Sequence, residues 1–177
     1  MKKISIFALI LIAFFIVGCN ELYEFPGMAF ESAFESLNQA RDKDGKEYYN
    51  VSIDQNNPFI VVDDNYIKKI INNKESFYLF IGNPTNYYSR VVLDTLLKSI
   101  KDNKIEKVFF VDSANFKEDN ELVKSLKIDI AKSALISVKN GKVDKYSLGL
   151  KVDKELNEDL TAEESSELLN DYNNVFK

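Results

Sequence analysis

The stretch from Ser76 to Arg90 constrains the fold of this chain more than any other. It begins with an apolar run, Phe77 to Ile81, which has the composition of a buried strand. Gly82 ends this run, and Asn83-Pro84-Thr85 is a turn sequence that leads directly into a segment with helical periodicity. Because strand and helix follow one another so closely, the stretch is typical of an α/β protein in which helices pack on a central sheet.

The same alternation continues from about residue 48 to the end of the chain. Apolar, β-branched runs and amphipathic segments predict the order βαβαβαββα, with strands at 59–63, 77–81, 107–112, 134–138 and 143–148, and with helices near 66–71, 86–100, 119–127 and 161–176. Asn140-Gly141 is a hairpin turn signal, and Thr161 with Glu164 forms a capping box. The order predicts one α/β domain over residues 48–177, with a mixed central sheet and helices on both faces.

Residues 1–18 have the features of a lipoprotein signal peptide. Lys2 and Lys3 precede an apolar stretch, Ile4 to Val17, which is too short to span a bilayer as a permanent helix. The stretch ends at Gly18-Cys19, which resembles a bacterial lipobox, and Cys19 is the only cysteine. The resemblance implies cleavage before Cys19, a lipid on its thiol, and a location at the extracytoplasmic face of the cell membrane. The alternatives are an ordinary cleaved signal peptide or an N-terminal anchor helix.

Residues 19–47 are predicted to be a lipid-anchored tether. Pro26-Gly27 is a breaker pair, and the apolar residues after it have near-helical spacing, which predicts a short amphipathic helix over about 28–37. The polar face of this helix is acidic, which disfavours binding to the membrane surface. We expect it to pack on the domain or to stay partly mobile.

Charge and composition exclude several classes of function. The net charge is −5, and it becomes −7 when Lys2 and Lys3 leave with the leader, so we expect no nucleic-acid binding. The chain has no histidine, and its one cysteine is the proposed lipidation site, which rules out the usual zinc ligands. Acidic pairs such as Asp63-Asp64 are explained as helix starts, so we expect no metal and no cofactor. The sequence leaves the oligomeric state open.

Two motifs and the order of elements resemble thioredoxin. The segment Phe80–Arg90 resembles the active-site segment of a Gram-positive thioredoxin-like family that accompanies bacteriocin export, in which the strand runs into Gly-x-Pro-Thr-Cys-x-x-Cys-Arg. The segment Ala134–Lys142 resembles the strand and hairpin after the thioredoxin cis-proline. The similarity covers roughly residues 50–150. It implies a thioredoxin-like fold and an accessory role in the export or folding of a secreted peptide.

The residues that carry thioredoxin chemistry are missing. Asn86 and Ser89 stand at the two cysteine positions, and Ser133 stands at the cis-proline position. Thiol–disulfide exchange needs a thiolate, an amide is no nucleophile, and a serine without any histidine lacks the usual base. A cis bond before a serine costs about 2.5–4 kcal/mol, so we expect a trans peptide there. The sequence therefore predicts that the protein is no redox enzyme.

A binding surface is what remains of such a site. By the resemblance, an extended peptide would lie beside the turn, in a groove formed by Pro84, Asn86, Tyr87, Ser89, Ser133 and Ala134. Tyr87 is expected to point outward, and Tyr88 to lie nearer the apolar stripe. The alternative is that these are merely tolerated surface residues. Two functions stay open: a protein that binds a peptide or protein partner, and an immunity or exclusion lipoprotein that sequesters a toxin or blocks its target.

Overall fold

The computed structural model of the chain describes residues 27–116, 120–128, 130, 132–150 and 158–177. The predicted signal peptide, the lipidation site Cys19 and the first residues of the tether lie outside these ranges. In the described ranges, no helix has the length and apolar character needed to cross a membrane.

The described elements have the predicted order βαβαβαββα. In chain order they are α2 (Gly27–Glu35), β1 (Phe59–Val61), α3 (Asp64–Asn72), β2 (Phe77–Gly82), α4 (Tyr87–Val91), α5 (Leu93–Asp102), β3 (Val108–Asp112), the 3-10 turn η1 (Ser113–Asn115), α6 (Glu121–Leu126), β4 (Ala134–Lys139), β5 (Lys142–Ser147) and α7 (Ala162–Phe176). The helix predicted over 86–100 is interrupted at Val92, so the structure has two helices here, α4 and α5.

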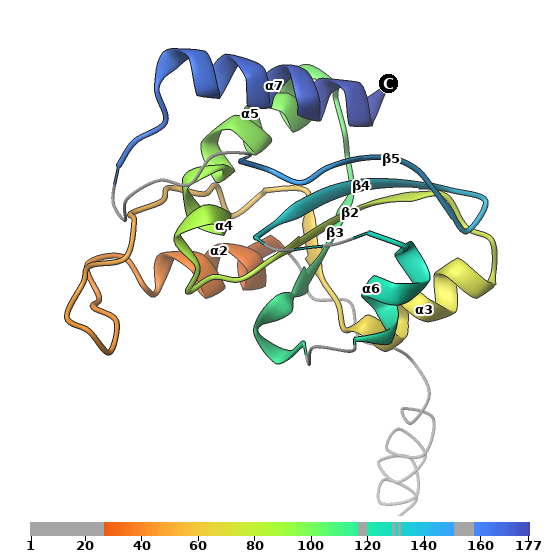
Figure 1. Cartoon of the computed structure of the whole chain (residues 1–177), viewed down its shortest axis with the longest axis horizontal. Coiled ribbons are helices and arrows are strands. Elements are labelled where there is room, and N and C mark those ends of the chain that lie inside the picture. Colours follow the sequence, from red (N-terminus) through yellow and green to blue (C-terminus); the bar gives the residue numbers. More distant parts are fainter. Residues whose placement is uncertain (1–26, 117–119, 129, 131, 151–157) are drawn as a thin grey trace, which may run out of the picture.

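The strands form one mixed sheet in the order β1-β3-β2-β4-β5 (Figure 1). Strands β1, β3 and β2 are parallel, whereas β4 and β5 are antiparallel to their neighbours. The turn between β4 and β5 has a positive φ at both Asn140 (52°) and Gly141 (71°), as a tight two-residue hairpin requires. This arrangement confirms the predicted fold class, a thioredoxin-like α/β fold with a mixed central sheet.

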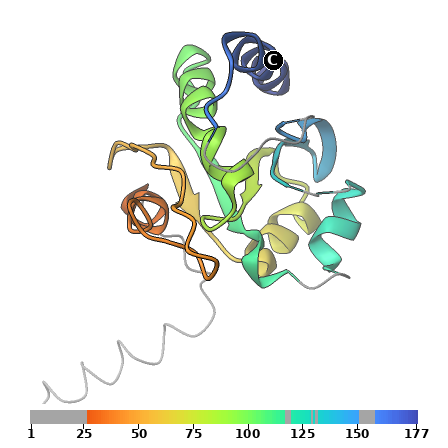
Figure 2. The same cartoon turned by 60° about the vertical axis from the view of Figure 1, so that its left-hand side comes forward.

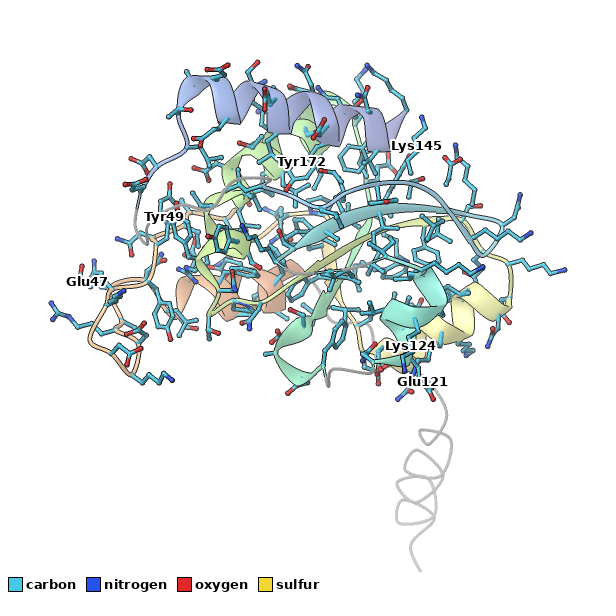
Figure 3. The ribbon with its side chains drawn as sticks, viewed as in Figure 1. Glu47, Tyr49, Glu121, Lys124, Lys145 and Tyr172 are labelled. Atoms are coloured by element: carbon cyan, nitrogen blue, oxygen red, sulfur yellow. The ribbon has the colours of Figure 1, made fainter. Side chains whose placement is uncertain are left out.

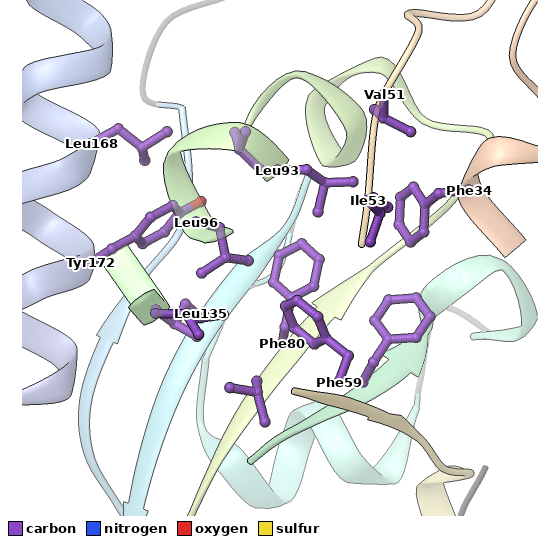
Figure 4. Close-up of a cluster of buried hydrophobic side chains, with 14 of the residues drawn as sticks. Phe34, Val51, Ile53, Phe59, Phe80, Leu93, Leu96, Leu135, Leu168 and Tyr172 are labelled. Carbon is purple, nitrogen blue, oxygen red and sulfur yellow. The ribbon is translucent and has the colours of Figure 1, made fainter. Parts of the chain in front are cut away.

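Helices cover both faces of the sheet because side chains alternate along each strand. In β2, Phe80 belongs to the core under α2, α4, α5 and α7, whereas Leu79 and Ile81 belong to the core under α3 and α6. Figure 2 shows the two groups of helices on opposite sides. Figure 4 shows the first core, where Phe59 and Phe80 lie between Phe34 from α2 and Leu135 from β4.

The short helix predicted within residues 19–47 packs on the domain, which is one of the two outcomes that the sequence left open. Phe30 and Phe34 of α2 are fully buried, and the Phe30 ring stacks on Phe59 of β1 at a centroid distance of 4.0 Å. Val51 and Ile53 join the same core. Burying a phenylalanine side chain stabilises a fold by about 1.5–3 kcal/mol, so these two rings hold α2 against the sheet. The domain therefore includes every described residue from Gly27 onward.

The two ends of the sheet differ in the loops that they carry. We term the end where β1, β2 and β3 begin the amino pole, and the end where they finish the carboxyl pole. The hairpin turn at Asn140 lies at the amino pole, since Val138 of β4 pairs with Phe77, the first residue of β2. The turn after β2 lies at the carboxyl pole, where Gly82 pairs with Asp112 at the end of β3.

Candidate functional site at the carboxyl pole

The turn between β2 and α4 is held by the side chains of its own asparagines. Asn86 is the N-cap of α4, and its Oδ1 accepts a hydrogen bond from the Tyr88 N–H at 2.8 Å. Asn83 Oδ1 accepts from both the N–H and the hydroxyl of Thr85, each at 2.8 Å. The side chain at the first cysteine position therefore starts a helix.

Ser89, at the second cysteine position, has a comparable structural role. Its side chain is fully buried, and its Oγ accepts from the Asn83 N–H at 2.9 Å. A Cβ at Gly82 would lie 3.1 Å from this Oγ and from the Phe80 ring, so glycine allows α4 to approach the end of β2. Asn86 and Ser89, which the resemblance places at the two cysteine positions, thus stabilise the turn.

Arg90 is the main residue at this site that the predicted groove did not include. It is fully buried, and its guanidinium donates to four neutral oxygens. These are the carbonyls of Tyr49, Phe34 (2.8 Å) and Pro84 (3.0 Å), and Asn38 Oδ1 (2.8 Å). Burial lowers the pKa of Arg90 from its usual value, but an arginine stays charged in proteins.

The acceptors of Arg90 come from three separate parts of the chain. Phe34 belongs to α2, Asn38 and Tyr49 belong to the connection after it, and Pro84 belongs to the turn. The guanidinium carbon also lies 6.0 Å from the Phe34 ring centroid and 5.9 Å from that of Tyr48, a cation–π geometry. Arg90 therefore fastens the N-terminal part of the domain to the turn.

The expected outward position of Tyr87 is wrong. Tyr87 is only 6% exposed, and its hydroxyl donates to the Glu158 carbonyl. Its ring packs edge-on against Tyr49 at 5.9 Å, and the Tyr49 hydroxyl donates to Asp159 Oδ1 at 2.8 Å. The segment before α7 therefore covers this side of α4, and Tyr49 lies beside it in Figure 3. Tyr88 is the more exposed of the two tyrosines.

Burial changes the ionisation of both tyrosines in this cluster. It raises the pKa of Tyr87 to about 12, and the charge of Glu158 contributes to the rise. Burial raises the pKa of Tyr49 as well, assisted by its hydrogen bond to Asp159. Both phenols are therefore neutral donors at physiological pH.

Three other residues of the predicted groove are buried, namely Pro84, Ser133 and Ala134. The peptide bond before Ser133 is trans, as predicted. Ser133 Oγ points toward the position that a Cβ on Gly149 would take, 2.8 Å away, and the Tyr172 hydroxyl oxygen lies 3.9 Å from the same point. Within the described part of the chain, neither hydroxyl has a hydrogen-bond partner. The Ser133 hydroxyl thus points into the interior and is not presented to a bound peptide.

The exposed part of the site is what we term the turn surface: Asn83, Thr85, Asn86, Tyr88 and Lys132. All five are at least partly exposed. The Lys132 Nζ lies 3.9 Å from the centroid of the Tyr88 ring, so a cation–π contact joins α4 to the chain just before β4. Sequence reasoning missed Lys132 because nothing in a local pattern couples it to Tyr88.

The comparisons with known proteins bear on the fold alone. No protein-family model matches the sequence, and no curated protein matches it. Among solved structures, the chain is similar to thioredoxin O2 from Arabidopsis thaliana in its oxidized state, with a TM-score of 0.41 and 12% identity, covering 54% of this chain and 85% of that one. The strand order and directions of the sheet are those of a thioredoxin-like fold. Over the described residues, no group of three or more His, Cys, Asp or Glu side chains is arranged to hold a metal ion.

Proposed function

We propose that this protein is a redox-inactive thioredoxin-like lipoprotein, anchored through Cys19 at the extracytoplasmic face of a bacterial membrane. Its turn surface binds a peptide or protein partner, and it assists the export or folding of a secreted peptide such as a bacteriocin. The observation that carries the proposal is the use of Asn86 and Ser89, at the two cysteine positions, as hydrogen-bonding supports of the turn.

The chemistry of these two side chains supports the lack of redox activity. Exchange with a disulfide requires a thiolate that attacks sulfur. The Asn86 amide oxygen accepts a helix N–H, and the buried Ser89 hydroxyl oxygen accepts the Asn83 N–H. The only cysteine of the chain is Cys19, which the proposal assigns to the lipid.

The rigidity of the turn supports a binding role. The buried side chains of Arg90 and Ser89 form hydrogen bonds with the backbone of the turn, at the Pro84 carbonyl and the Asn83 N–H. A partner would therefore bind a surface that is already ordered. Tyr88 supplies rigid contact area and Lys132 a positive charge, and tyrosines are enriched among the residues that contribute most to binding. Thr85, at the tip of the turn, is exposed.

Photo-crosslinking in cells tests the proposal on the intact protein. A photoreactive amino acid is placed at Thr85 or at Lys132, with a control at Asn170, which is exposed on α7. We expect a discrete adduct from the first two positions and none from the control, and mass spectrometry of the adduct identifies the partner. Absence of an adduct at both test positions, or equal adducts at all three, would contradict binding at the turn surface.

Deletion of the gene separates the accessory role from the immunity alternative. Loss of an accessory protein lowers the amount of secreted peptide, whereas loss of an immunity protein makes the cell sensitive to its own toxin. We expect lower output with unchanged sensitivity. The opposite result would assign the turn surface to toxin capture.

A further inference from the structure

Helix α2 determines where the N-terminal segment enters the domain. Its first residue lies at the amino pole, because the Gly27 carbonyl accepts a hydrogen bond from Asn57 Nδ2 at 2.9 Å, two residues before β1. Its last turn lies at the carboxyl pole, because Arg90 of α4 donates hydrogen bonds to both the Phe34 and the Pro84 carbonyls. The first residue of α2 therefore lies at the amino pole, whereas its last turn lies near the turn surface.

The distance from the proposed anchor to this entry point is short. Cys19 precedes Gly27 by eight residues. An extended chain covers at most about 3.6 Å per residue, so the anchor lies within about 29 Å of the start of α2. Because Phe30 and Phe34 are fixed in the core, the entry point cannot move relative to the sheet. The tether limits how far the membrane lies from the start of α2, and the charge of each pole then bears on which pole faces it.

The amino pole carries a positive charge although the chain as a whole is acidic. Segments 54–58, 72–77, 101–108 and 139–142 lie at this pole and contain six lysines against four carboxylates, a net charge of +2. All six lysines are exposed: Lys74, Lys101, Lys104, Lys107, Lys139 and Lys142. Lys139 is bridged to Asp144 at 2.7 Å.

Because salt screens distant charges, the charge of the pole nearest to a membrane determines its attraction to that membrane more than the net charge of −7 does. The six residues of β2 separate the two poles by roughly 20 Å, which is about twice the Debye length at physiological ionic strength. Carboxylates such as Asp63, Asp64 and Asp112 lie at the carboxyl pole, where β1 and β3 end. An anionic surface attracts the amino pole and repels the other.

A cavity of about 310 Å³ opens at the same pole. Its lining includes the rings of Tyr66, Phe77 and Phe109 and the side chains of Lys107 and Lys139. The Lys107 Nζ lies 4.6 Å from the centroid of the Phe109 ring. Of these side chains, tyrosine and lysine are typical of the places where proteins meet the headgroup region of a bilayer.

We infer that the amino pole lies against the membrane and that its lysines contact anionic phospholipid headgroups, so that the turn surface faces away from the bilayer. This inference rests on the lipid anchor of the proposed function. It assigns the two poles different partners: lipid at the amino pole and a peptide or protein at the carboxyl pole.

Paramagnetic NMR on anchored protein tests the orientation. The mature chain, from Cys19 onward, is coupled through its only thiol to a maleimide lipid in nanodiscs that also contain a gadolinium-chelating lipid. With phosphatidylglycerol present, we expect several-fold stronger broadening of the Gly141 and Asn103 amides than of the Thr85 amide. High salt, or discs of phosphatidylcholine alone, should reduce this contrast. Equal broadening at the two poles, or stronger broadening at Thr85, would overturn the inference.

Matched charge changes test the role of the lysines. The double variant Lys101→Gln/Lys142→Gln removes two charges from the amino pole and should reduce the contrast several-fold. Lys43→Gln/Lys46→Gln removes two equally exposed charges from the loop after α2 and should leave it unchanged. An equal effect of both pairs would overturn the inference.

Chemical coupling keeps this test independent of the proposed function. It anchors the protein whether or not cells lipidate Cys19, and mass spectrometry of the protein from cell membranes reports lipidation separately. If the two poles are broadened equally while Thr85 still forms its crosslink, only the inference about orientation is contradicted. The converse result, orientation without crosslinks, would remove binding at the turn surface.

Discussion

Arg90 and the pair Ser133–Tyr172 are buried polar groups in the same half of the molecule, but they differ in how they are satisfied. Arg90 donates to four oxygens from three parts of the chain. The hydroxyls of Ser133 and Tyr172 have no partner in the part of the chain that the structure describes, although Tyr172 projects into the core from α7 (Figure 4). A buried polar group stabilises a fold only when its hydrogen bonds are made.

The difference separates the two halves of the candidate site. On the turn side, the residues at and after the cysteine positions form a connected network that fixes the backbone. On the side of Ser133, the hydroxyl of this serine is bonded by no residue that the structure describes. We therefore expect substitutions on the two sides to change stability in opposite directions.

The largest effect is expected for Arg90→Met. It removes the donors of three backbone carbonyls and of Asn38, and unsatisfied buried acceptors cost about 1–3 kcal/mol each. We predict a loss of at least about 3 kcal/mol in the free energy of unfolding, measured with urea. Arg41→Met is the matched control, since Arg41 is exposed and bridged to Glu47, and it should change stability by less than about 0.5 kcal/mol. Similar losses for both variants would show that the hydrogen bonds of Arg90 contribute no more to stability than an exposed ion pair does.

Tyr172→Phe should have the opposite sign. Because the Tyr172 hydroxyl is buried without a partner in the described part of the chain, its removal should raise the free energy of unfolding by about 1 kcal/mol. Tyr78→Phe is the control, because the Tyr78 hydroxyl donates to the Phe176 carbonyl at 3.1 Å. That variant should lose about 1 kcal/mol. A loss for Tyr172→Phe as well would mean that the hydroxyl is satisfied in solution, and the contrast with Arg90 would fail.

Tyr87→Phe is expected to show a smaller effect that depends on pH. At neutral pH the variant loses the hydrogen bond to the Glu158 carbonyl, worth about 1 kcal/mol. The pKa of Tyr87 is raised from 10.0 to about 12, so the unfolded chain ionises first. The stabilisation is complete below pH 10 and declines as the pH rises from 10 to 12. Urea unfolding of both proteins across this range should show the wild-type advantage shrinking, and a constant difference would contradict burial of Tyr87.

Much of the fold can be predicted from local patterns. Apolar runs identified the strands, Asn140-Gly141 identified the hairpin, and Thr161 with Glu164 identified the start of α7. The position of α2 could not be predicted, because the burial of Phe30 depends on Phe59, which is far along the chain.

The candidate site was less predictable for the same reason. Local sequence identified the turn and the start of a helix after it. It could not decide which of Tyr87 and Tyr88 is buried, because the segment at Glu158 decides it. Nor could it identify the role of Arg90, whose acceptors lie as far away as Phe34.

The central claim is that the side chains at the two cysteine positions support the turn, while its exposed surface binds. The most direct measurement combines the unfolding free energy with crosslinking from Thr85 in Ser89→Ala, because the Ser89 side chain is fully buried and lies outside the turn surface. The account predicts that the variant loses about 1 kcal/mol and keeps the Thr85 adduct at a temperature where it is folded. Unchanged stability together with loss of the adduct would contradict it, because Ser89 would then act by contacting the partner.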